Sequence, residues 1–282
     1  MQRVGRVAEL REVLRERRAR GQRIAFVATM GYLHEGHLRL VDEARNRADL
    51  VVMSVFVNPL QFSPSEDLSR YPRDLEGDAQ KAASRGVDVF FSPDATEIYP
   101  EEPRVVVTPH ALASRWEGAA RPGHFEGVLT IVAKLFNAVQ PDVAIFGQKD
   151  IQQAILIKAM VRDLNFPIEI VVSPTVREAD GLAMSSRNSY LDADSRGRAL
   201  GLSTALRAAA EAYAAGERSG ETLESIARAR LAQHGVDDVD YVAVADPRTL
   251  EPVSRAGEGT VVAVAARVGR TRLIDNIILG SR

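Results

Sequence analysis

The sequence predicts an α/β fold, in which a doubly wound parallel sheet covered by helices precedes a smaller α+β domain. The first observation is that near-continuous runs of Val, Ile and Phe alternate with helical patterns along the first part of the chain. Strands buried on both faces of a parallel sheet give such unbroken apolar runs. The second observation is a change of composition after about Val176, where Ala/Arg-rich helical stretches precede strand-like pieces separated by turn residues. That order is typical of an antiparallel sheet with its own helices.

Apolar periodicity predicts the elements of the first part in order. Leu38, Val41, Ala44 and Ala48 recur at helical spacing between two buried runs and indicate an amphipathic helix. Because parallel crossovers are right-handed, the carboxyl ends of the strands meet at one edge of the sheet, where Rossmann-like folds bind ligands. We expect strands at residues 24–30, 49–58, 87–93, 141–147 and 168–174, strand-like apolar character at 105–109, and helices at 36–48, 125–140 and about 150–164.

The second part reads as two helices followed by three strands. A loop rich in Ser, Asp and Asn, READGLAMSSRNSYLDADS, leads into it. We therefore place a Rossmann-like domain at residues 1–176 and a smaller α+β domain at 177–282. Helices are expected at about 196–214 and within 216–235, and strands at 239–247, 260–269 and 271–279.

Composition excludes several classes of protein. The net charge of −2 gives no field to recruit nucleic acid or an anionic membrane. No apolar run approaches the roughly 18 residues of a membrane span, and the charged start of the chain has no apolar core of a signal peptide. Cysteine is absent, so a cytoplasmic setting is the expectation. Only four of the 36 basic residues are lysines, which draws attention to Lys149.

The turn TMGYLHEGHL, residues 29–38, carries the most informative motif. Gly31 and Gly36 have the spacing of a phosphate-binding loop, but His37 stands where such a loop has its lysine. The remaining H-x-G-H places His34 and His37 on one face of a helix N-terminus, which favours bound phosphate. An incidental polar turn and a zinc site are the alternatives, although a third metal ligand of the usual kind is missing nearby.

Two further loops follow predicted strands on the same edge. Asn58 and Gln61 have neutral amides that can orient hydroxyls and a carboxylate, although a plain Asn-Pro turn also explains Asn58. Lys149 follows the strand 141–147 near a helix N-terminus, where Asp150 is either an N-cap or a ligand. Gln153 lies about one turn into that helix.

The loop between the two predicted domains contains MSSRN, residues 184–188. Its two hydroxyls and guanidinium suit a mobile phosphate clamp, and a solvated serine-rich linker is an equal alternative. His124, in RPGH, is more simply read as part of a turn than as a ligand.

Together these segments resemble the pantothenate synthetase family of the H-x-G-H nucleotidylyl-transferase superfamily. TMGYLHEGHLRLVDEA, SVFVNPLQF, YPRD, RPGHFEGV, AKLFNAVQPDVAIFGQKDIQQ and PTVREADGLAMSSRNSYL carry the resemblance in that order, over nearly the whole chain. H-x-G-H alone marks only the superfamily, whereas VFVNPxQF, GQKD and MSSRN at these spacings are far more specific. One departure is Ala28, where a proline is expected before Thr-Met-Gly.

The resemblance implies an activity and its partners. ATP and (R)-pantoate would form pantoyl adenylate and pyrophosphate, and β-alanine would then attack the adenylate to give pantothenate and AMP. It further implies Mg²⁺ and a homodimer. Because a reactive acyl adenylate must be kept from water, we expect the second domain, with its MSSRN loop, to act as a lid. A different acid or phosphate ester as substrate, and a nucleotide-binding protein without catalysis, are the alternatives that the motifs leave open.

The resemblance also implies residue roles by position. His37 matches the residue usually assigned as a general acid. Independently of the resemblance, the chemistry of the residues suggests that His34, His37, Lys149 and Arg187 neutralise phosphate charge, with Ser185 and Ser186 as donors. The implied ATP contacts are Met30, Gly31, Tyr32, Leu33, His34, Glu35, Gly36, His37, Gly147, Gln148, Lys149, Asp150, Val176, Met184, Ser185, Ser186 and Arg187, and the implied substrate contacts are Gln61, Gln153, Asn58, Thr29 and Met30.

Overall fold

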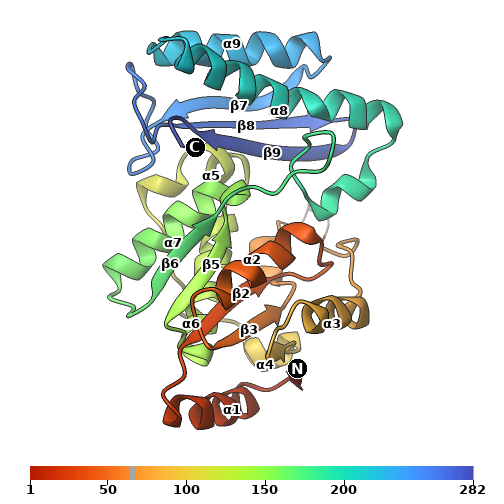
Figure 1. Cartoon of the computed structure of the whole chain (residues 1–282), viewed down its shortest axis with the longest axis vertical. Coiled ribbons are helices and arrows are strands. Elements are labelled where there is room, and N and C mark those ends of the chain that lie inside the picture. The colour runs from red at the N-terminus through yellow and green to blue at the C-terminus, as the bar shows by residue number, and fades with distance from the viewer. Residues whose placement is uncertain (64–67, 282) are drawn as a thin grey trace. The chain divides into compact units, whose positions relative to one another are not determined.

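A computed structural model describes residues 1–63 and 68–281 of the chain (Figure 1). Six parallel strands form one sheet in the order β1-β4-β3-β2-β5-β6. The strands are β1 Gln2–Val4, β2 Ile24–Thr29, β3 Leu50–Val55, β4 Val89–Phe91, β5 Val143–Gly147 and β6 Glu169–Ser173. The predicted parallel sheet is therefore confirmed, and β2 and β5 lie side by side at its centre.

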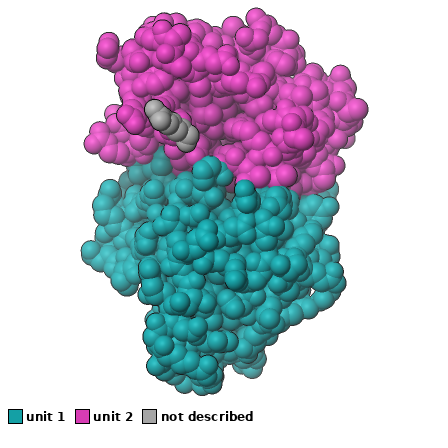
Figure 2. Space-filling view, viewed as in Figure 1, with its two compact units in different colours: residues 1–113, 121–147, 152–174 teal, residues 114–120, 148–151, 175–282 magenta. Residues whose placement is uncertain are grey.

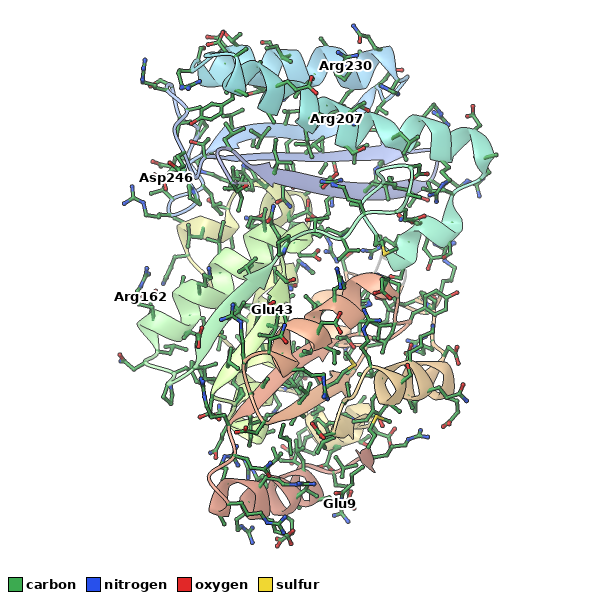
Figure 3. The ribbon with its side chains drawn as sticks, viewed as in Figure 1. Glu9, Glu43, Arg162, Arg207, Arg230 and Asp246 are labelled. Atoms are coloured by element: carbon green, nitrogen blue, oxygen red, sulfur yellow. The ribbon has the colours of Figure 1, made fainter. Side chains whose placement is uncertain are left out.

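Helices cover both faces of this sheet, which makes it doubly wound. Alternate residues of β2 face opposite ways: Phe26 belongs to the hydrophobic cluster with α1, α6 and α7, and Val27 to the cluster with α2 and α3. The helices of this part are α1 Val7–Ala19, α2 Glu35–Arg45, α3 Leu75–Ser84, α4 Ala95–Ile98, α6 His124–Val139 and α7 Ile151–Asp163, with 3₁₀ turns η1 Pro59–Gln61, η2 Ala111–Ala113 and η3 Gln148–Asp150. Charged side chains such as Glu9 and Arg162 project from the outer faces of the helices (Figure 3).

The sheet order reverses direction between β2 and β5. From β2 the chain winds through β3 to β4, and from β5 it winds the other way to β6. Such a switch point leaves a crevice outside the carboxyl ends of the two central strands, where open α/β sheets bind ligands. The turn 30–34 leaves β2 at this position.

Several elements of the structure differ from those that the sequence patterns predict. The apolar segment 105–109 forms no strand; it lies against α6, and the Val107 N–H donates to Thr130 Oγ1 at 3.0 Å while Val105 is 86% exposed. Conversely, the sequence pattern does not predict α1, because arginine and glutamate surround its buried Leu10 and Leu14. The elements β1, α3 and α4 also lie outside the elements predicted from the sequence.

The chain divides into two compact units (Figure 2). Unit 1 comprises residues 1–113, 121–147 and 152–174, and unit 2 comprises 114–120, 148–151 and 175–282. The sequence places the domain boundary after residue 176, and in the structure the chain passes from unit 1 to unit 2 for the last time after residue 174. The short segments 114–120 and 148–151, which precede this boundary, also belong to unit 2.

Unit 2 is an α+β structure built on an antiparallel sheet in the order β7-β8-β9. Its core joins apolar side chains of the three strands and of α8 and α9, as Leu202, Leu223 and Val264 illustrate. Its elements are α5 Trp116–Ala120, η4 Ser186–Tyr190, α8 Ala193–Ala214, α9 Gly220–Gln233, β7 Asp238–Ala245, β8 Val261–Val268 and β9 Thr271–Ile278. In the described parts of both units, the helices lack the length and apolar character that crossing a membrane requires.

A glycine in α6 permits the close approach of the η1 turn. A Cβ on Gly127 would lie 2.3 Å from the backbone oxygen of Leu60, which cannot give way as a flexible side chain could. Gly127 therefore positions the turn that carries Asn58 and Gln61. Gly197 in α8 is a natural contrast, because it is exposed and a Cβ there would meet nothing within 4 Å.

We predict opposite stability effects for alanine at these two helical glycines. Gly127→Ala should destabilise the protein by about 1–3 kcal/mol through overpacking, although alanine favours helices. Gly197→Ala should stabilise it by about 0.5–1 kcal/mol, because only the helix propensity changes. Urea unfolding followed by circular dichroism measures both, and equal effects at the two positions would contradict the packing argument.

Candidate functional site

The turn between β2 and α2 is shaped by a threonine and a glycine. Thr29, the last residue of β2, donates its hydroxyl to Ser54 O at 2.8 Å and accepts from the Gly31 N–H at 3.2 Å. Gly31 has φ = 84°, and a Cβ there would lie 2.8 Å from both the Asp78 carboxylate and a Val55 methyl. Only glycine fits this conformation and space.

Asp78 in α3 holds the next part of the turn. Its carboxylate is buried and accepts from the N–H groups of Tyr32 and Leu33 at 2.7 and 2.6 Å. One turn later in α3, the Lys81 ammonium donates to Leu33 O at 2.9 Å. Both polar backbone groups of Leu33 are thereby satisfied, and the chain enters α2 in a fixed direction.

The two imidazoles of H-x-G-H lie together at the start of α2. His34 is the N-cap residue, and the ring centroids of His34 and His37 are 4.1 Å apart. The His34 N–H donates to His37 Nδ1 at 3.3 Å. Since Nδ1 accepts this bond, the neutral His37 ring carries its proton on Nε2. A helix N-terminus and two imidazoles at the switch point form a setting suited to an anion.

Asn58 is the centre of a buried amide network beside this turn. The phenol of Tyr99 donates to Asn58 Oδ1 at 2.9 Å, and Asn58 Nδ2 donates to Gln61 Oε1 at 3.2 Å and to Gly127 O at 3.1 Å. Burial raises the pKa of Tyr99 above its ordinary value, so the phenol keeps its proton and its role as donor. The direction of these bonds orients the Gln61 amide, whose Nε2 lies 3.0 Å from Met30 Sδ.

His124, at the start of α6, holds the backbone of Gln61. Its Nδ1 lies 2.9 Å from Gln61 O, and its Nε2 lies 2.9 Å from a guanidinium nitrogen of Arg121. A carbonyl can only accept and a guanidinium can only donate, so these two contacts require a neutral ring with its proton on Nδ1. His124 is thus a buried supporting residue, beyond the plain turn expected from RPGH.

Unit 2 carries the second group of predicted site residues. The η3 turn with Gln148, Lys149 and Asp150 is attached to β9, since Asn276 Nδ2 donates to Gln148 O and to Lys149 O at 2.9 Å each. In the loop before α8, the Met184 N–H donates to Val176 O at 2.9 Å.

The 3₁₀ turn η4 begins at Ser185 in the same loop. Ser185 Oγ accepts from the Arg187 N–H at 3.2 Å, so a hydroxyl and a guanidinium of the MSSRN segment lie on one short turn.

The predicted site residues therefore belong to two structural groups. Gln153 lies on the first turn of α7 with intermediate exposure. Unit 1 contains Thr29, Met30, Gly31, Tyr32, Leu33, His34, Glu35, Gly36, His37, Asn58, Gln61, Gly147 and Gln153, and unit 2 contains Gln148, Lys149, Asp150, Val176, Met184, Ser185, Ser186 and Arg187. Sequence patterns missed the residues that support them, namely Asp78, Lys81, Tyr99, Arg121 and Asn276.

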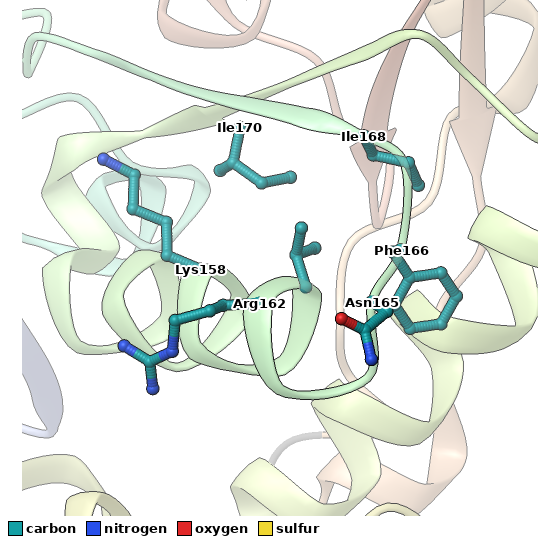
Figure 4. Close-up of a pocket in the computed structure, with 7 residues that line it drawn as sticks. Lys158, Arg162, Asn165, Phe166, Ile168 and Ile170 are labelled. Atoms are coloured by element: carbon teal, nitrogen blue, oxygen red, sulfur yellow. The ribbon is translucent and has the colours of Figure 1, made fainter.

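A surface depression of about 490 Å³ lies elsewhere on unit 1 (Figure 4). Lys158, Val161, Arg162, Asn165, Phe166, Ile168 and Ile170 line it, between the end of α7 and β6. None of these belongs to the predicted site. Within residues 1–63 and 68–281, no group of three or more His, Cys, Asp or Glu side chains could hold a metal ion.

Comparison with known proteins gives near full-length matches. The family model described as pantoate-beta-alanine ligase matches residues 2–278. The chain is 50% identical to a pantothenate synthetase of Pelotomaculum thermopropionicum, with 97% of each chain covered. It resembles the crystal structure of the Thermus thermophilus pantothenate synthetase with a TM-score of 0.93, 48% identity, and coverage of 98% and 99%.

A further solved relative is more distant and contains ligands. The pantoate-beta-alanine ligase of Francisella tularensis, described as complexed with beta-gamma ATP and beta-alanine, has a TM-score of 0.81 and 32% identity to this chain. The match covers 100% of this chain and 99% of the relative.

We predict that the buried carboxylate of Asp78 is important for stability as well as for the shape of the turn. Asp78→Asn should destabilise the protein by about 1–3 kcal/mol, because an amide presents one acceptor and one donor to two N–H groups. Asp49→Asn is the control, since exposed Asp49 accepts one bond from the Arg23 N–H, and it should cost less than about 0.5 kcal/mol. Urea denaturation compares them; a harmless Asp78→Asn would contradict the role.

Proposed function

The chain belongs to the pantoate-beta-alanine ligase family, and on that premise we propose that it makes pantothenate through a pantoyl-adenylate intermediate. Family membership establishes the ligase activity; the route and the residue roles are our proposal. The observation that carries it is the pair of imidazoles at the α2 N-terminus, next to the sheet's switch point. The Francisella relative's complex supports ATP and β-alanine as ligands.

The first proposed step is attack of the pantoate carboxylate on the α-phosphorus of ATP. A carboxylate–phosphorus bond forms, the bond from that phosphorus to the bridging oxygen breaks, and pyrophosphate leaves. The carboxylate is already ionised at neutral pH and needs no protein base. In the second step the β-alanine amine attacks the acyl carbon, AMP leaves with the oxygen, and the new amide nitrogen loses a proton.

Catalysis then depends on position and on neutralising phosphate charge. We propose that His34, His37, Lys149 and Arg187 supply that charge or hydrogen-bond donation, with Ser185 and Ser186 as further donors. His37 would donate from Nε2, the nitrogen that its contact with the His34 N–H leaves protonated. The proposed nucleotide contacts are the segments 30–37, 147–150 and 184–187 together with Val176.

The neutral amide group is proposed to bind pantoate. Its hydroxyls and carboxylate require both donors and acceptors, which Gln61 and Gln153 possess without adding charge, whereas the predicted contact Asn58 is buried with its amide already bonded to Tyr99, Gln61 and Gly127. Thr29 and Met30 border the same turn. The orientation imposed on Gln61 by Asn58 would present a fixed amide to the substrate before binding, which lowers the cost of ordering the site.

Mg²⁺ is proposed to arrive with the ATP phosphates. Hard oxygen ligands suit this ion, and it commonly keeps waters and substrate phosphates as ligands. The described site residues offer imidazoles, amides, hydroxyls and cations with Asp150 as a nearby carboxylate, which fits a phosphate-borne ion better than an all-protein cage.

Water must be kept from the reactive adenylate, and we propose that residues 177–282 act as the lid. The loop with Met184 and Arg187 belongs to this part and would close on the nucleotide. A cytoplasmic location is proposed from the absence of cysteine.

Isotope exchange between ATP and pyrophosphate tests the adenylate route and the role of His37. The wild-type protein with Mg²⁺ should exchange only when pantoate is present, and β-alanine should then give AMP. His37→Ala should reduce exchange by about 10²–10³, comparable to losing one preorganised donor. His110→Ala, at an exposed loop histidine, is the matched control and should behave as wild type. ADP as product would rule out the route, and near-normal exchange by His37→Ala would rule out its role.

We also propose a homodimer formed through the β6 edge of unit 1. β6 is the last strand in the sheet order, and half-exposed Ile168 and Ile170 line the depression beside it (Figure 4). Leu164 nearby is 54% exposed. A second copy pairing along this edge would cover the apolar surface and the strand's outer backbone groups.

Sedimentation equilibrium should therefore give twice the chain mass of 30.8 kDa. Ile170→Arg should shift the equilibrium to monomer, because it places a charge at the interface. Val105→Arg is the control, since Val105 is 86% exposed elsewhere on unit 1, and this variant should stay dimeric. A monomeric wild type, or a dimer lost only in Val105→Arg, would contradict the proposed surface.

A further inference from the structure

Two consecutive residues of β9, Asp275 and Asn276, connect segments that are far apart in the sequence. Both side chains are buried, with 3% and 1% of their surface exposed. They pair with Val264 and Ala263 of the central strand β8, which fixes their position in the unit 2 sheet. β9 is therefore a rigid base for whatever these two polar side chains hold.

The Asn276 amide is fully engaged with the η3 turn. Its Nδ2 donates to the carbonyls of Gln148 and Lys149 at 2.9 Å each, and its Oδ1 accepts from Gln148 Nε2 at 3.2 Å. These bonds explain why residues 148–151 belong to unit 2, although β5 before them and nearly all of α7 after them belong to unit 1 (Figure 2). The backbone of Lys149 is thus held by β9.

The Asp275 carboxylate holds the loop that leads to MSSRN. It accepts two bonds from the Arg177 guanidinium, at 2.7 and 3.0 Å, and Arg177 also donates to Gly181 O at 3.2 Å. A β-bridge between Arg177 and Ala183 closes this loop just before Met184. A bidentate pair with a buried carboxylate fixes direction as well as distance.

We propose that Asp275 and Asn276 are positioning residues that set Lys149 and the 184–187 segment at a fixed separation for the ATP phosphates. This inference rests on the proposed function, in which both segments contact the nucleotide. Neither residue is assigned a contact with substrate; each acts through the backbone or the guanidinium that it binds. Because phosphoryl transfer depends on the placement of cationic groups, small displacements of Lys149 should weaken ATP use.

The test measures Michaelis constants in pantoate-dependent exchange for Asn276→Ala, Asn276→Asp and Asp275→Asn. Asn276→Asp keeps the side-chain size, but it replaces the amide group that donates to the two carbonyls with a carboxylate oxygen, which can only accept. Asp275→Asn keeps the size but loses the charge that holds Arg177. Each should raise the KM for ATP by about tenfold, the scale of one lost hydrogen bond, while the KM for pantoate stays within about twofold.

Ser219→Ala is the matched control for a purely structural effect. Ser219 caps α9 in the same unit by accepting from the Thr222 N–H at 3.2 Å, so its loss lowers stability without touching η3 or the MSSRN loop. It should lower Tm with both KM values unchanged. Thermal stabilisation by ATP alone is a second readout, and it should be weakened in the β9 variants and kept in the control.

The outcomes separate this inference from the proposed function. Wild-type protein without exchange would overturn the adenylate route itself. Active wild type with an unchanged KM for ATP in the folded β9 variants would overturn only the positioning role. Should Asn276→Ala fail to fold by circular dichroism, the two size-conserving variants decide the question.

Discussion

The turn between β2 and α2 depends on one buried carboxylate, that of Asp78. Tyr32 has φ = 50° and Gly31 has φ = 84°, so the chain turns sharply before α2, and the N–H groups of Tyr32 and Leu33 are outside the backbone hydrogen bonds of strand and helix. Asp78 accepts from the N–H groups of Tyr32 and Leu33, at a distance in sequence of 46 and 45 residues. Without such an acceptor, buried N–H groups would cost free energy and the turn would open. The direction of α2, and with it His34 and His37, follows from this contact.

Neutral groups serve the same purpose in the η1 turn, which carries the residues proposed to bind pantoate. Tyr99 donates to Asn58, and Asn58 donates to Gln61, so each amide has a defined orientation. His124 holds the carbonyl of Gln61 from the other side. The bonds among Tyr99, Asn58 and Gln61 join neutral groups, so salt should affect them little, whereas the charged Arg121 contacts His124 on the other side of Gln61. Gly127 makes this network possible, because a side chain there would push η1 away.

Local patterns predicted most of the fold and the polar motifs, and distant contacts explain what they missed. The apolar runs of β2, β3 and β5 are continuous because both faces of these strands are covered, which is a local signal. The residues of H-x-G-H, GQKD and MSSRN are contiguous and could be recognised by type and spacing. Whether they act as assigned is still a prediction.

Supporting residues gave no such signal. Asp78 and Asn276 look like an ordinary helical carboxylate and an ordinary strand amide until the fold brings them to their partners. The segment 105–109 shows the opposite failure, since its valines favour a strand but the segment pairs with no strand among the described residues. A pattern of residue types is a property of one segment, whereas strand pairing requires two segments that lie side by side.

The organisation of unit 2 adds a second kind of long-range dependence. Its segment 114–120 comes from the middle of the first part of the chain, and a buried pair holds it: Arg272 of β9 contacts Glu117 of α5 at 2.6 Å and Asp240 of β7 at 2.6 Å. Burial lowers the pKa of Arg272, but the two carboxylates more than offset it and the net pKa is raised. Burial, together with Glu117, raises the pKa of Tyr241, which donates to Glu117 at 3.0 Å.

One strand therefore organises three separate pieces of chain. Arg272 holds residues 114–120, Asp275 holds the loop before MSSRN, and Asn276 holds η3. Each of these contacts buries a polar group that would be costly if left alone, so the pieces cannot leave β9 without a penalty. Two of the three pieces interrupt the sequence of unit 1, and the backbone of Lys149 is bonded to β9 of unit 2 although β5 of unit 1 directly precedes η3. In this family member, the lysine and the histidines proposed for the same ligand are thus held by different units: Asn276 of β9 holds the backbone of Lys149, and Asp78 of α3 holds the turn before His34 and His37.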